Sequence, residues 1–320
     1  MAKKSRYSGI GGQAVLEGIM MKNKEKYAVA VRRPDGGITV EIDNDRGILP
    51  GSRLKEIPFV RGIFNFIDSL VLGMKCLNFS ASFYEEEEEE RHSGEKKSRS
   101  GAGEKFLSVV VTCFAVALAL GLFVVLPYYL SSLLKGSLLN QSLLAIIEGV
   151  MRILIFILYV GGISLMKDIR RLYSYHGAEH KCINCIERGR PLTVDNVMRS
   201  SRLHKRCGTS FIFFVFLVSI VLFFFIRVEN PAARVGIRIA LMPVVAGISY
   251  EIIRLAGRTS NIFIQILSAP GMAIQRMTTK EPDRSMAEVA IAAVEAVFDW
   301  KQYLKDNFGY DTEDSGEEEG

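Results

Sequence analysis

Four long apolar runs constrain this chain more than any other feature of its sequence. They are Phe106–Leu130, Leu143–Met166, Phe211–Ile226 and Val235–Leu255, and they contain few charged residues. A helix of about 20 apolar residues is long enough to cross the hydrocarbon core of a bilayer, whereas soluble domains rarely contain runs of this kind. The sequence therefore predicts a mainly α-helical, polytopic membrane protein with about four transmembrane helices.

The charges of the connecting loops predict how these helices are oriented. Residues 167–209 contain ten Lys and Arg side chains, whereas the loops at 131–142 and 227–234 together contain three. Because positively charged loops are retained in the cytoplasm, we expect residues 167–209 and both termini on the cytoplasmic side of the plasma membrane. The chain begins Met-Ala-Lys-Lys-Ser-Arg, and no early apolar stretch has a cleavage-site pattern, so we expect no secretory signal.

The net charge of +5 lies mostly in the loop at 167–209. A basic surface next to a membrane attracts anionic lipid headgroups, which we expect as partners together with the bilayer itself. No nucleic acid is expected as a partner. A cytoplasmic location also keeps cysteines reduced, which favours metal binding over disulfide formation.

Residues 1–56 are predicted to form a small β-rich region. Tyr27–Val31 and Ile38–Ile42 flank the turn sequence Arg33–Gly37, an arrangement typical of a β-hairpin. The glycine-rich segment at 9–18 lacks the Lys-Ser/Thr ending of a phosphate-binding loop and does not follow a predicted strand. A tight glycine turn is therefore the favoured interpretation of this segment.

The segments between and after the apolar runs differ in character. Residues 57–84 carry their apolar side chains on one helical face, which predicts an amphipathic helix in the membrane interface or packed on the helical bundle. Residues 85–105 and 309–320 are rich in charge and are expected to be disordered. Residues 259–284 are apolar but interrupted by Ser-Ala-Pro-Gly, which favours an interfacial or re-entrant segment.

Residues 285–308 are predicted to form one amphipathic helix that opens with a capping box of Ser285 and Glu288. Its apolar positions repeat at coiled-coil spacing, so they are expected to pack on the bundle or on a protein partner.

The predicted order of segments along the chain is a cytoplasmic β-rich region (1–56), an interfacial helix (57–84), a linker (85–105), two transmembrane helices (106–166), a cytoplasmic His/Cys loop (167–209), two further transmembrane helices (210–258), an interfacial or re-entrant segment (259–284), an amphipathic helix (285–308) and an acidic tail (309–320).

The His/Cys loop contains a first metal-binding pattern. His176, Glu179 and His180 form a His-x-x-Glu-His sequence, which places both imidazoles on one face of a helix. In hydrolases with this pattern the imidazoles bind Zn²⁺ and the carboxylate accepts a proton from the metal's water, so Glu179 is the candidate catalytic base. The candidates for a further ligand are His204, Cys182, Cys185, Cys207 and Glu251.

A second pattern overlaps the first. Cys182-x-x-Cys185 and His204-x-x-Cys207 are two chelating pairs separated by eighteen residues. This spacing resembles a structural zinc ribbon, in which four ligands complete the tetrahedron and leave no position open for chemistry. The two patterns are compatible with one split site or with two sites. Packing, or phosphate binding at the basic surface, is the alternative to any metal.

Charged residues inside the apolar runs also need an account, because an unpaired charge is costly within a bilayer. Glu148 and Arg152 are four residues apart and are expected to pair along one helix. Arg238 is expected to extend towards the membrane surface. Glu251 is expected either to pair with Arg254 or to reach the His/Cys loop.

Three blocks of this sequence resemble the YqhQ-like family of bacterial membrane proteins, namely Gly11–Lys22, Tyr175–Cys182 and Arg206–Ser210. The resemblance extends from about Ser8 to Lys305. It implies a membrane protein of a family described as predicted metal-dependent enzymes, and it implies no substrate and no catalytic residues.

These observations favour an integral membrane enzyme that depends on a divalent metal, with zinc as the expected ion and a hydrolytic reaction at the cytoplasmic face. Joint binding by His176 and His180 requires their ring nitrogens to lie within about 6 Å of each other. The alternative is a membrane scaffold or assembly factor in which Cys182, Cys185, His204 and Cys207 hold a structural zinc ion. A transporter is less favoured because no internal repeat is evident.

Overall fold

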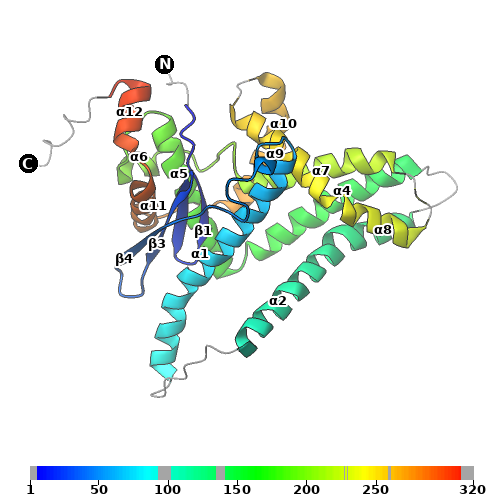
Figure 1. The fold of residues 1–320 in the computed structure, drawn as a ribbon, viewed down its shortest axis with the longest axis horizontal. Coiled ribbons are helices and arrows are strands. Elements are labelled where there is room, and N and C mark those ends of the chain that lie inside the picture. The colour runs from blue at the N-terminus through cyan, green and yellow to red at the C-terminus, as the bar shows by residue number, and fades with distance from the viewer. Residues whose placement is uncertain are drawn as a thin grey trace, which may run out of the picture.

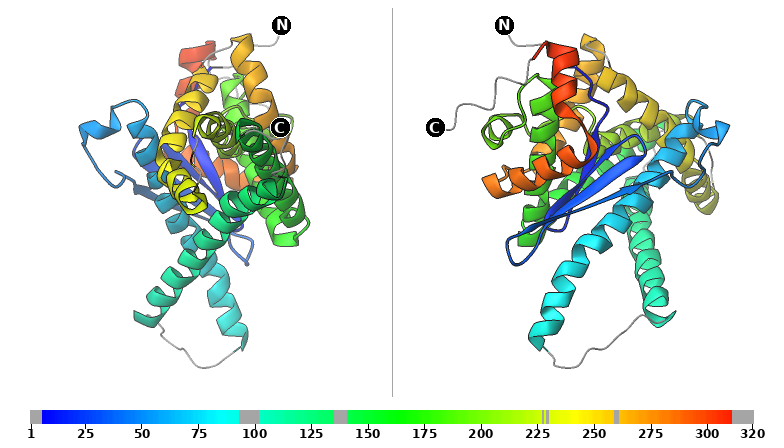
Figure 2. Two further views of the ribbon diagram at one scale, coloured as in Figure 1. Left: turned by 90° about the vertical axis from the view of Figure 1, so that its right-hand side faces the viewer. Right: turned by 60° about the vertical axis from the view of Figure 1, so that its left-hand side comes forward.

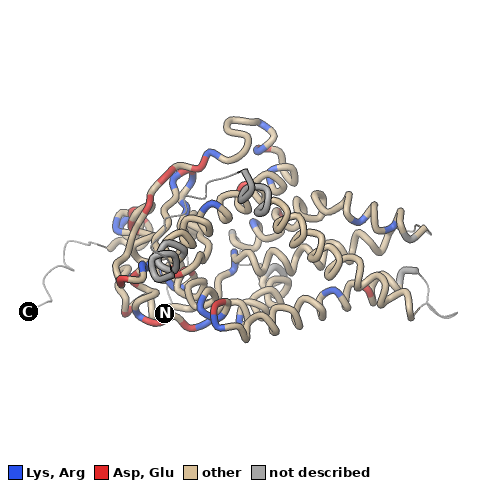
Figure 3. The backbone as a smooth tube through the Cα atoms, turned by 90° about the horizontal axis from the view of Figure 1, so that it is seen from below, with Lys and Arg blue, Asp and Glu red and all other residues tan. Residues whose placement is uncertain are grey.

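The computed structural model describes residues 6–92, 102–134, 141–226, 228, 230–258 and 261–310 of the 320-residue chain. A sheet with its covering helices forms one half of the molecule, and long apolar helices extend from the other half (Figure 1). The C-terminal end of α1 (Val60–His92) and the N-terminal end of α2 (Ala102–Leu120) project away from the rest (Figure 2). Most Lys, Arg, Asp and Glu residues lie in the half that contains the sheet (Figure 3).

The sheet is a meander of four antiparallel strands in the order β1-β2-β3-β4. The predicted hairpin is confirmed as β3 (Lys26–Arg32) and β4 (Ile38–Asn44), in which Arg32 lies opposite Ile38. The glycine-rich segment is more than the turn that the sequence predicts, because it forms β1 (Gly11–Val15) and leads into β2 (Gly18–Asn23). Glycine has a low intrinsic preference for strands, and pairing with β2 overrides it here.

Alternate side chains of the sheet point to two different cores. Ile19 and Met21 belong to the core shared with α5 (Lys167–Glu187) and α11 (Arg284–Val297). Met20 faces the opposite side and packs with Leu72 and Cys76 of α1. The sheet is therefore covered on both faces, and α6 (Val194–Met198) and α12 (Trp300–Phe308) complete the outer layer (Figure 1).

Three helical segments of the described chain are long and apolar enough to cross a membrane, or four if a bent pair counts as one span. The first segment joins α2, the π-helical turn η2 (Gly121–Val125) and α3 (Leu126–Leu133). The second is α4 (Gln141–Ile163) and the third is α7 (Gly208–Phe225). The bent pair consists of α8 (Pro231–Ala240) and α9 (Met242–Arg258), which meet at 41°. The fourth predicted span thus corresponds to two helices with a bend between them.

Two segments differ from their predicted limits. α1 follows the short 3-10 turn η1 (Arg53–Lys55) and continues through the six glutamates to His92, beyond the end predicted at residue 84. α2 begins at Ala102, before the predicted end of the linker at residue 105. Residues 93–101 of the predicted linker and the tail from residue 311 lie outside the described residues.

The segment predicted as interfacial or re-entrant contains a single helix, α10 (Ile262–Thr278), with Pro270 inside it. A proline removes one helical hydrogen bond, and here the helix is retained where it packs closely on α7. Gly271 permits that close packing, since a Cβ atom on it would lie 3.2 Å from Ser210.

The helix predicted at 285–308 is two helices, α11 and α12. The N-cap of α11 is Asp283, whose side chain accepts a hydrogen bond from the Met286 N–H at 2.9 Å, so the predicted capping box at Ser285 does not form. Phe298 is extended and ends α11, and Asp299 caps α12. The apolar stripe of α11 is buried against β2, β3 and α5.

The charged residues of the apolar helices form a buried cluster. Glu148 accepts hydrogen bonds from Arg152 at 3.0 Å and from Arg238. The expectation that Arg238 extends to the surface therefore does not hold, because it is buried in the bundle. Glu251 pairs with Arg61 at the start of α1 and lies apart from the His/Cys residues.

Candidate metal centre

Helix α5 presents the two histidines of the first pattern to the same side. It is buried along most of its second half, and the ring centroids of His176 and His180 are 4.4 Å apart. Gly177 allows the chain that follows α10 to lie directly against this helix, since a Cβ atom on it would be only 2.0 Å from the Lys280 carbonyl oxygen. This close packing places His176 in contact with Thr278, which is 102 residues away in the sequence.

A backbone carbonyl orients each histidine. The Nδ1 atom of His176 is 3.0 Å from the Thr278 oxygen, and the Nδ1 atom of His180 is 2.6 Å from the Arg202 oxygen. A carbonyl oxygen only accepts hydrogen bonds, so we assign the hydrogen of each ring to Nδ1, which leaves the Nε2 lone pair of the neutral ring free. Histidines that bind metals are usually held in this way by groups behind them.

Cys207 adds a third ligand-type atom to the pair of histidines. It is the N-cap of α7, where its Sγ atom accepts the Thr209 N–H at 3.4 Å and lies 3.3 Å from His176 Nε2. The ligand atoms of His176, His180 and Cys207 all lie within 4.8 Å of one another. A nitrogen and a sulfur bound to one tetrahedral zinc ion are roughly 3.5 Å apart, given bond lengths of about 2.1 and 2.3 Å. The His176–Cys207 pair has this spacing, and the three residues together could hold a metal ion.

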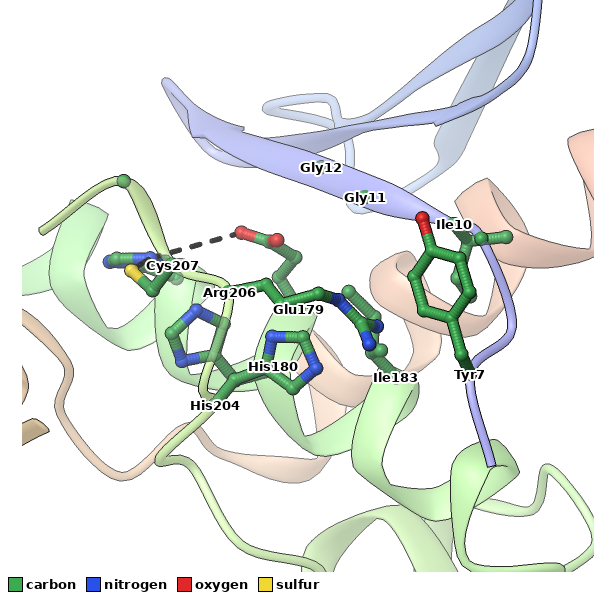
Figure 4. Close-up of a pocket in the computed structure, with 13 residues that line it drawn as sticks. Tyr7, Ile10, Gly11, Gly12, Glu179, His180, Ile183, His204, Arg206 and Cys207 are labelled. Atoms are coloured by element: carbon green, nitrogen blue, oxygen red, sulfur yellow. Dashed lines mark hydrogen bonds and ion pairs between the residues drawn. The ribbon is translucent and has the colours of Figure 1, made fainter. Parts of the chain in front are cut away.

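Glu179 lies beside these ligands with one oxygen unpaired. Its Oε2 atom is 4.0 Å from His176 Nε2 (Figure 4) and has no hydrogen-bond partner among the described residues. Burial raises the pKa of Glu179, and the neighbouring His176 and the backbone N–H of Gly12 lower that pKa in part. Leaving a buried carboxylate oxygen unpaired is costly, which is typical of a group that meets a ligand or a reacting molecule.

The two cysteines of the Cys-x-x-Cys sequence lie elsewhere. Cys182 and Cys185 are fully buried in the core that α5 shares with the sheet and α11. Cys185 donates a hydrogen bond to the Pro191 oxygen at 3.4 Å, and burial raises the pKa of its thiol to about 11. The thiolate is the form that binds zinc, so this environment disfavours ligation by Cys185. Neither cysteine joins the group formed by His176, His180 and Cys207.

His204 is next to the centre without belonging to that group. Its ring centroid is 5.6 Å from that of His180, and burial lowers the pKa of His204 to about 4. Gln275 of α10 fixes its main chain by accepting the His204 N–H at 3.0 Å and donating to the His204 oxygen at 2.7 Å. His204 therefore lines the centre as a neutral side chain at neutral pH.

Glu187 is a charged residue beside the candidate centre that the sequence patterns do not identify. Burial alone would raise the pKa of Glu187, but the nearby His204 and Arg206 outweigh burial and hold it at about 2. The carboxylate pairs with Arg206 and accepts hydrogen bonds from Ser8, whose hydroxyl is 2.8 Å away. Glu187 thus fixes the N-terminal segment beside the metal-ligand group.

A cavity of about 280 Å³ connects these groups (Figure 4). Glu179, His180 and His204 lie below the start of β1, and Tyr7 and Ile10 lie to their right in this view. The cavity is lined by Tyr7, Gly9, Ile10, Gly11, Gly12, His176, Glu179, His180, Ile183, His204, Arg206, Cys207 and Gly208. It therefore brings together β1, α5 and the start of α7.

Comparisons with known proteins match the chain to one family and to one relative. The model of a family described as "Protein of unknown function (DUF1385)" matches residues 57–300. The chain is 37% identical over 301 residues to the "Uncharacterized protein YqhQ" of Bacillus subtilis (strain 168), an alignment that covers 91% of this chain and 92% of the relative. No solved structure matches the chain significantly.

Proposed function

The chain belongs to the DUF1385 family of YqhQ-like proteins, and since that family has no known activity, we propose from the chain's own residues that it is a membrane-bound, metal-dependent hydrolase. His176, His180 and Cys207 hold a divalent ion, with zinc as the expected metal. Glu179 is the general base. The observation that carries this proposal is the convergence of three ligand atoms within 4.8 Å beside a buried carboxylate oxygen that has no hydrogen-bond partner in the described part of the chain.

The arrangement of these residues suits hydrolysis. Three protein ligands leave a position open at a tetrahedral ion, as in catalytic zinc sites, whereas structural sites use four. A bound ion would act as a Lewis acid on a carbonyl or phosphoryl oxygen and would make water more acidic. Glu179 accepts the proton of the attacking water and then gives it to the leaving group. The carbonyls of Thr278 and Arg202 keep both imidazoles in the required tautomer.

We further propose that the protein is a multi-pass protein of the plasma membrane, with the sheet, the metal centre and both termini in the cytoplasm. The helices that are apolar enough to cross a membrane support the membrane location. The excess of Lys and Arg at 167–209 over the loops at the other ends of these helices supports the cytoplasmic placement of the centre and the termini. Anionic headgroups remain the proposed lipid partners of this basic side.

A structural zinc site in a scaffold or assembly factor is the second candidate function. It draws support from the position of the ligands, because an ion at His176, His180 and Cys207 would join α5 to the start of α7. It is weakened by the burial of Cys182 and Cys185 in the core, which removes the second thiolate pair. The stripe at 285–308 offers a scaffold little apolar surface for a partner, since α11 is buried against the sheet.

The test uses the purified full chain in lipid nanodiscs, with its metal content measured by mass spectrometry. We expect about one zinc ion per chain, and a loss of binding in His176→Ala and Cys207→Ser. Cys185→Ser is the matched control, and we expect it to keep the ion. Glu179→Gln should also keep the ion but lose about 10²- to 10⁴-fold of any hydrolysis of ester, amide and phosphoester probes.

Three results would reject the proposal or redirect it. A wild-type protein that binds no metal after chelator-free purification rejects both candidate functions. Loss of the ion in Cys185→Ser, together with an unchanged Glu179→Gln, favours the structural site. Retention of full activity in Glu179→Gln excludes Glu179 as the base.

A further inference from the structure

We propose that the backbone N–H of Gly208, at the start of α7, stabilises the oxyanion that forms when this centre hydrolyses an ester or amide. The inference rests on the proposed hydrolytic function and specifies its substrate class, an acyl compound. Three features support it, namely a free N–H group at the mouth of the cavity, a buried carboxylate oxygen without a partner in the same cavity, and the charges of the lining residues.

Gly208 connects the cavity to the surface of the protein. It lines the cavity and is exposed, whereas the lining residues His204 and Cys207 beside it are buried. A Cβ atom on Gly208 would have no neighbour within 4 Å. A small molecule can therefore reach this position from the solvent without passing between β1 and α5.

The Gly208 N–H is a free donor at the positive end of a long helix. α7 has 18 residues, and the first N–H groups of a helix have no partner within the helix. The Thr209 and Phe211 N–H groups are bonded to Cys207, by its Sγ atom at 3.4 Å and its carbonyl oxygen at 3.2 Å. The Gly208 N–H has no hydrogen-bond partner among the described residues. Such a group at a helix N-terminus stabilises negative charge.

Neither conformation nor packing requires a glycine at position 208. Gly208 does not have the positive φ that favours glycine, and the space around a Cβ atom there is open. Within a helix, glycine is less favourable than alanine by about 1 kcal/mol. Glycine is used where a ligand comes close to the backbone, and this account fits the exposed N–H of Gly208.

Glu179 is a second group in this cavity that lacks a partner. It is 4% exposed, and its Oε2 atom has no hydrogen-bond partner among the described residues. Its carboxylate points towards Cys207, the residue that directly precedes Gly208 (Figure 4). An acceptor for the proton of water and a donor to an oxyanion therefore lie on either side of Cys207.

The charges of the lining residues favour an acyl substrate over a phosphoryl substrate. Phosphoryl transfer spreads charge over three oxygens, which proteins commonly stabilise with several cations. Among the described lining residues, Arg206 is the one Lys or Arg, and it is paired with Glu187. A single N–H donor suits the single oxyanion of ester or amide hydrolysis.

The reaction assigns one step to each group. The oxygen of water forms a bond to the carbonyl carbon, and the π electrons of the carbonyl move to its oxygen, which accepts a hydrogen bond from the Gly208 N–H. Glu179 accepts the proton of the water. The carbonyl then re-forms, the bond to the leaving oxygen or nitrogen breaks, and Glu179 delivers the proton to that atom. The products are a carboxylic acid and an alcohol or amine.

The first test observes the Gly208 N–H directly in the zinc-loaded full chain in nanodiscs. Cys207–Gly208 is the one Cys-Gly pair in the sequence, so labelling cysteine carbonyls with ¹³C and glycine nitrogens with ¹⁵N isolates this amide in NMR spectra. Dimethylphosphinate is a tetrahedral anion, and dimethyl sulfone is a neutral molecule of similar shape. We expect dimethylphosphinate to shift the Gly208 amide proton downfield and dimethyl sulfone to leave it unchanged.

The second test removes the donor with Gly208→Pro. Proline is favoured at the first position of a helix, and Cys207 already has the extended ψ of 146° that the residue before a proline requires. We therefore expect zinc content and melting temperature to stay at the wild-type level. Affinity for dimethylphosphinate should fall about 10- to 100-fold by calorimetry, since a hydrogen bond to a charged group is lost. With 4-nitrophenyl acetate, kcat should fall about 10²- to 10³-fold and KM should change little.

Arg284→Pro is the matched control. It places proline at the first position of α11, after the extended residue Asp283, and Arg284 does not line the cavity. We expect wild-type affinity for dimethylphosphinate in this variant. An equal loss in both proline variants would assign the effect to proline itself and overturn the inference.

The remaining outcomes separate this inference from the proposed function. An unshifted Gly208 amide with bound dimethylphosphinate, or unchanged affinity in Gly208→Pro, overturns the role of Gly208 and leaves a metal-dependent hydrolase. Faster hydrolysis of 4-nitrophenyl phosphate than of 4-nitrophenyl acetate overturns the acyl substrate class. Absence of zinc, or failure of acetohydroxamate to bind the zinc-loaded protein, rejects the proposed function and this inference with it.

Discussion

Single glycines decide how closely the parts of the candidate metal centre approach one another. A side chain at Gly12 would meet the Glu179 Cγ atom at 3.1 Å and the Met20 oxygen at 2.6 Å. Gly177 is in contact with the chain at Lys280, whose N–H donates to the Tyr173 oxygen at 2.8 Å. These contacts hold the segment after α10 against α5, so that the Thr278 carbonyl reaches His176.

Gly177→Ala is expected to separate that segment from α5, because the added methyl group would lie 2.0 Å from the Lys280 oxygen. We expect a loss of stability of about 1–3 kcal/mol, as for other overpacked sites. Zinc affinity should fall roughly 10- to 100-fold, since His176 loses the carbonyl that orients it. Thermal unfolding and competition with a chelator measure the two effects.

Gly162→Ala in α4 is the matched control for this prediction. A Cβ atom there has no neighbour within 4 Å, so we expect unchanged zinc affinity and at most a gain of about 1 kcal/mol from helix propensity. Unchanged zinc affinity in Gly177→Ala would contradict the role assigned to Thr278.

For single residues, sequence patterns predict the side chains of the site but not the residues that hold these side chains in position. The spacing of His176 and His180 is enough to place them on one helical face. Cys207 was one of several candidate ligands, and its selection depends on where α7 begins relative to α5. Gln275 and Thr278 have no local signal, because they act on residues 71 and 102 positions away.

Among the helices, a buried charge cluster connects elements that are distant in sequence. Arg152 of α4 donates to the Phe123 oxygen in the π-helical turn at 2.8 Å and to Ser219 of α7 at 2.8 Å. Arg238 of α8 shares the Glu148 carboxylate with Arg152. The Phe123 carbonyl that accepts from Arg152 lies within the π-helical turn, and such turns are frequent at functional sites.

Glu148→Gln is expected to destabilise the helical bundle severely. The change removes the carboxylate that compensates two buried guanidinium groups, and loss of one partner from a buried ion pair costs about 3–5 kcal/mol. Thermal unfolding in detergent micelles measures the effect. Glu288→Gln is the control, because the Glu288 side chain is 51% exposed in its pair with Arg32 and should contribute less than about 1 kcal/mol. Equal melting temperatures of both variants would argue against a structural role of the cluster.

The boundaries of helices and strands were predicted where the pattern of apolar residues is strongly periodic. They were missed where tertiary contacts determine the end of an element. The hairpin at β3 and β4 and the apolar helices follow from local patterns. The break at Phe298 and the continuous helix through Pro270 do not, because each depends on packing against α5, the sheet or α7. The positions of β1 and β2 were missed for the same reason, since glycine-rich strands carry little local signal.

For the whole molecule, the candidate centre lies where the half with the sheet meets the apolar helices. Cys207 directly precedes α7, and Thr278 ends α10. The sequence predicts this location from two independent patterns, the apolar runs and the His/Cys loop between them. It could not predict that the sheet closes over the centre, because β1 and α5 are more than 150 residues apart, as shown by the pair of Glu17 and Arg171 at a separation of 154.

The proposed orientation predicts a definite pattern of chemical labelling in cells. Of the free cysteines in the described chain, Cys113 is exposed and the others are buried, so a Cys113→Ser chain is a suitable background. Ala232→Cys lies at the exposed start of α8, and Lys301→Cys lies on the exposed surface of α12. If the ten Lys and Arg residues of 167–209 retain this segment in the cytoplasm as proposed, a membrane-impermeant maleimide should label position 232 in intact cells and position 301 only after permeabilisation. Labelling of position 301 in intact cells would place the candidate metal centre outside the cell. Oxidising conditions there would favour oxidation of Cys207 over its role as a thiolate ligand.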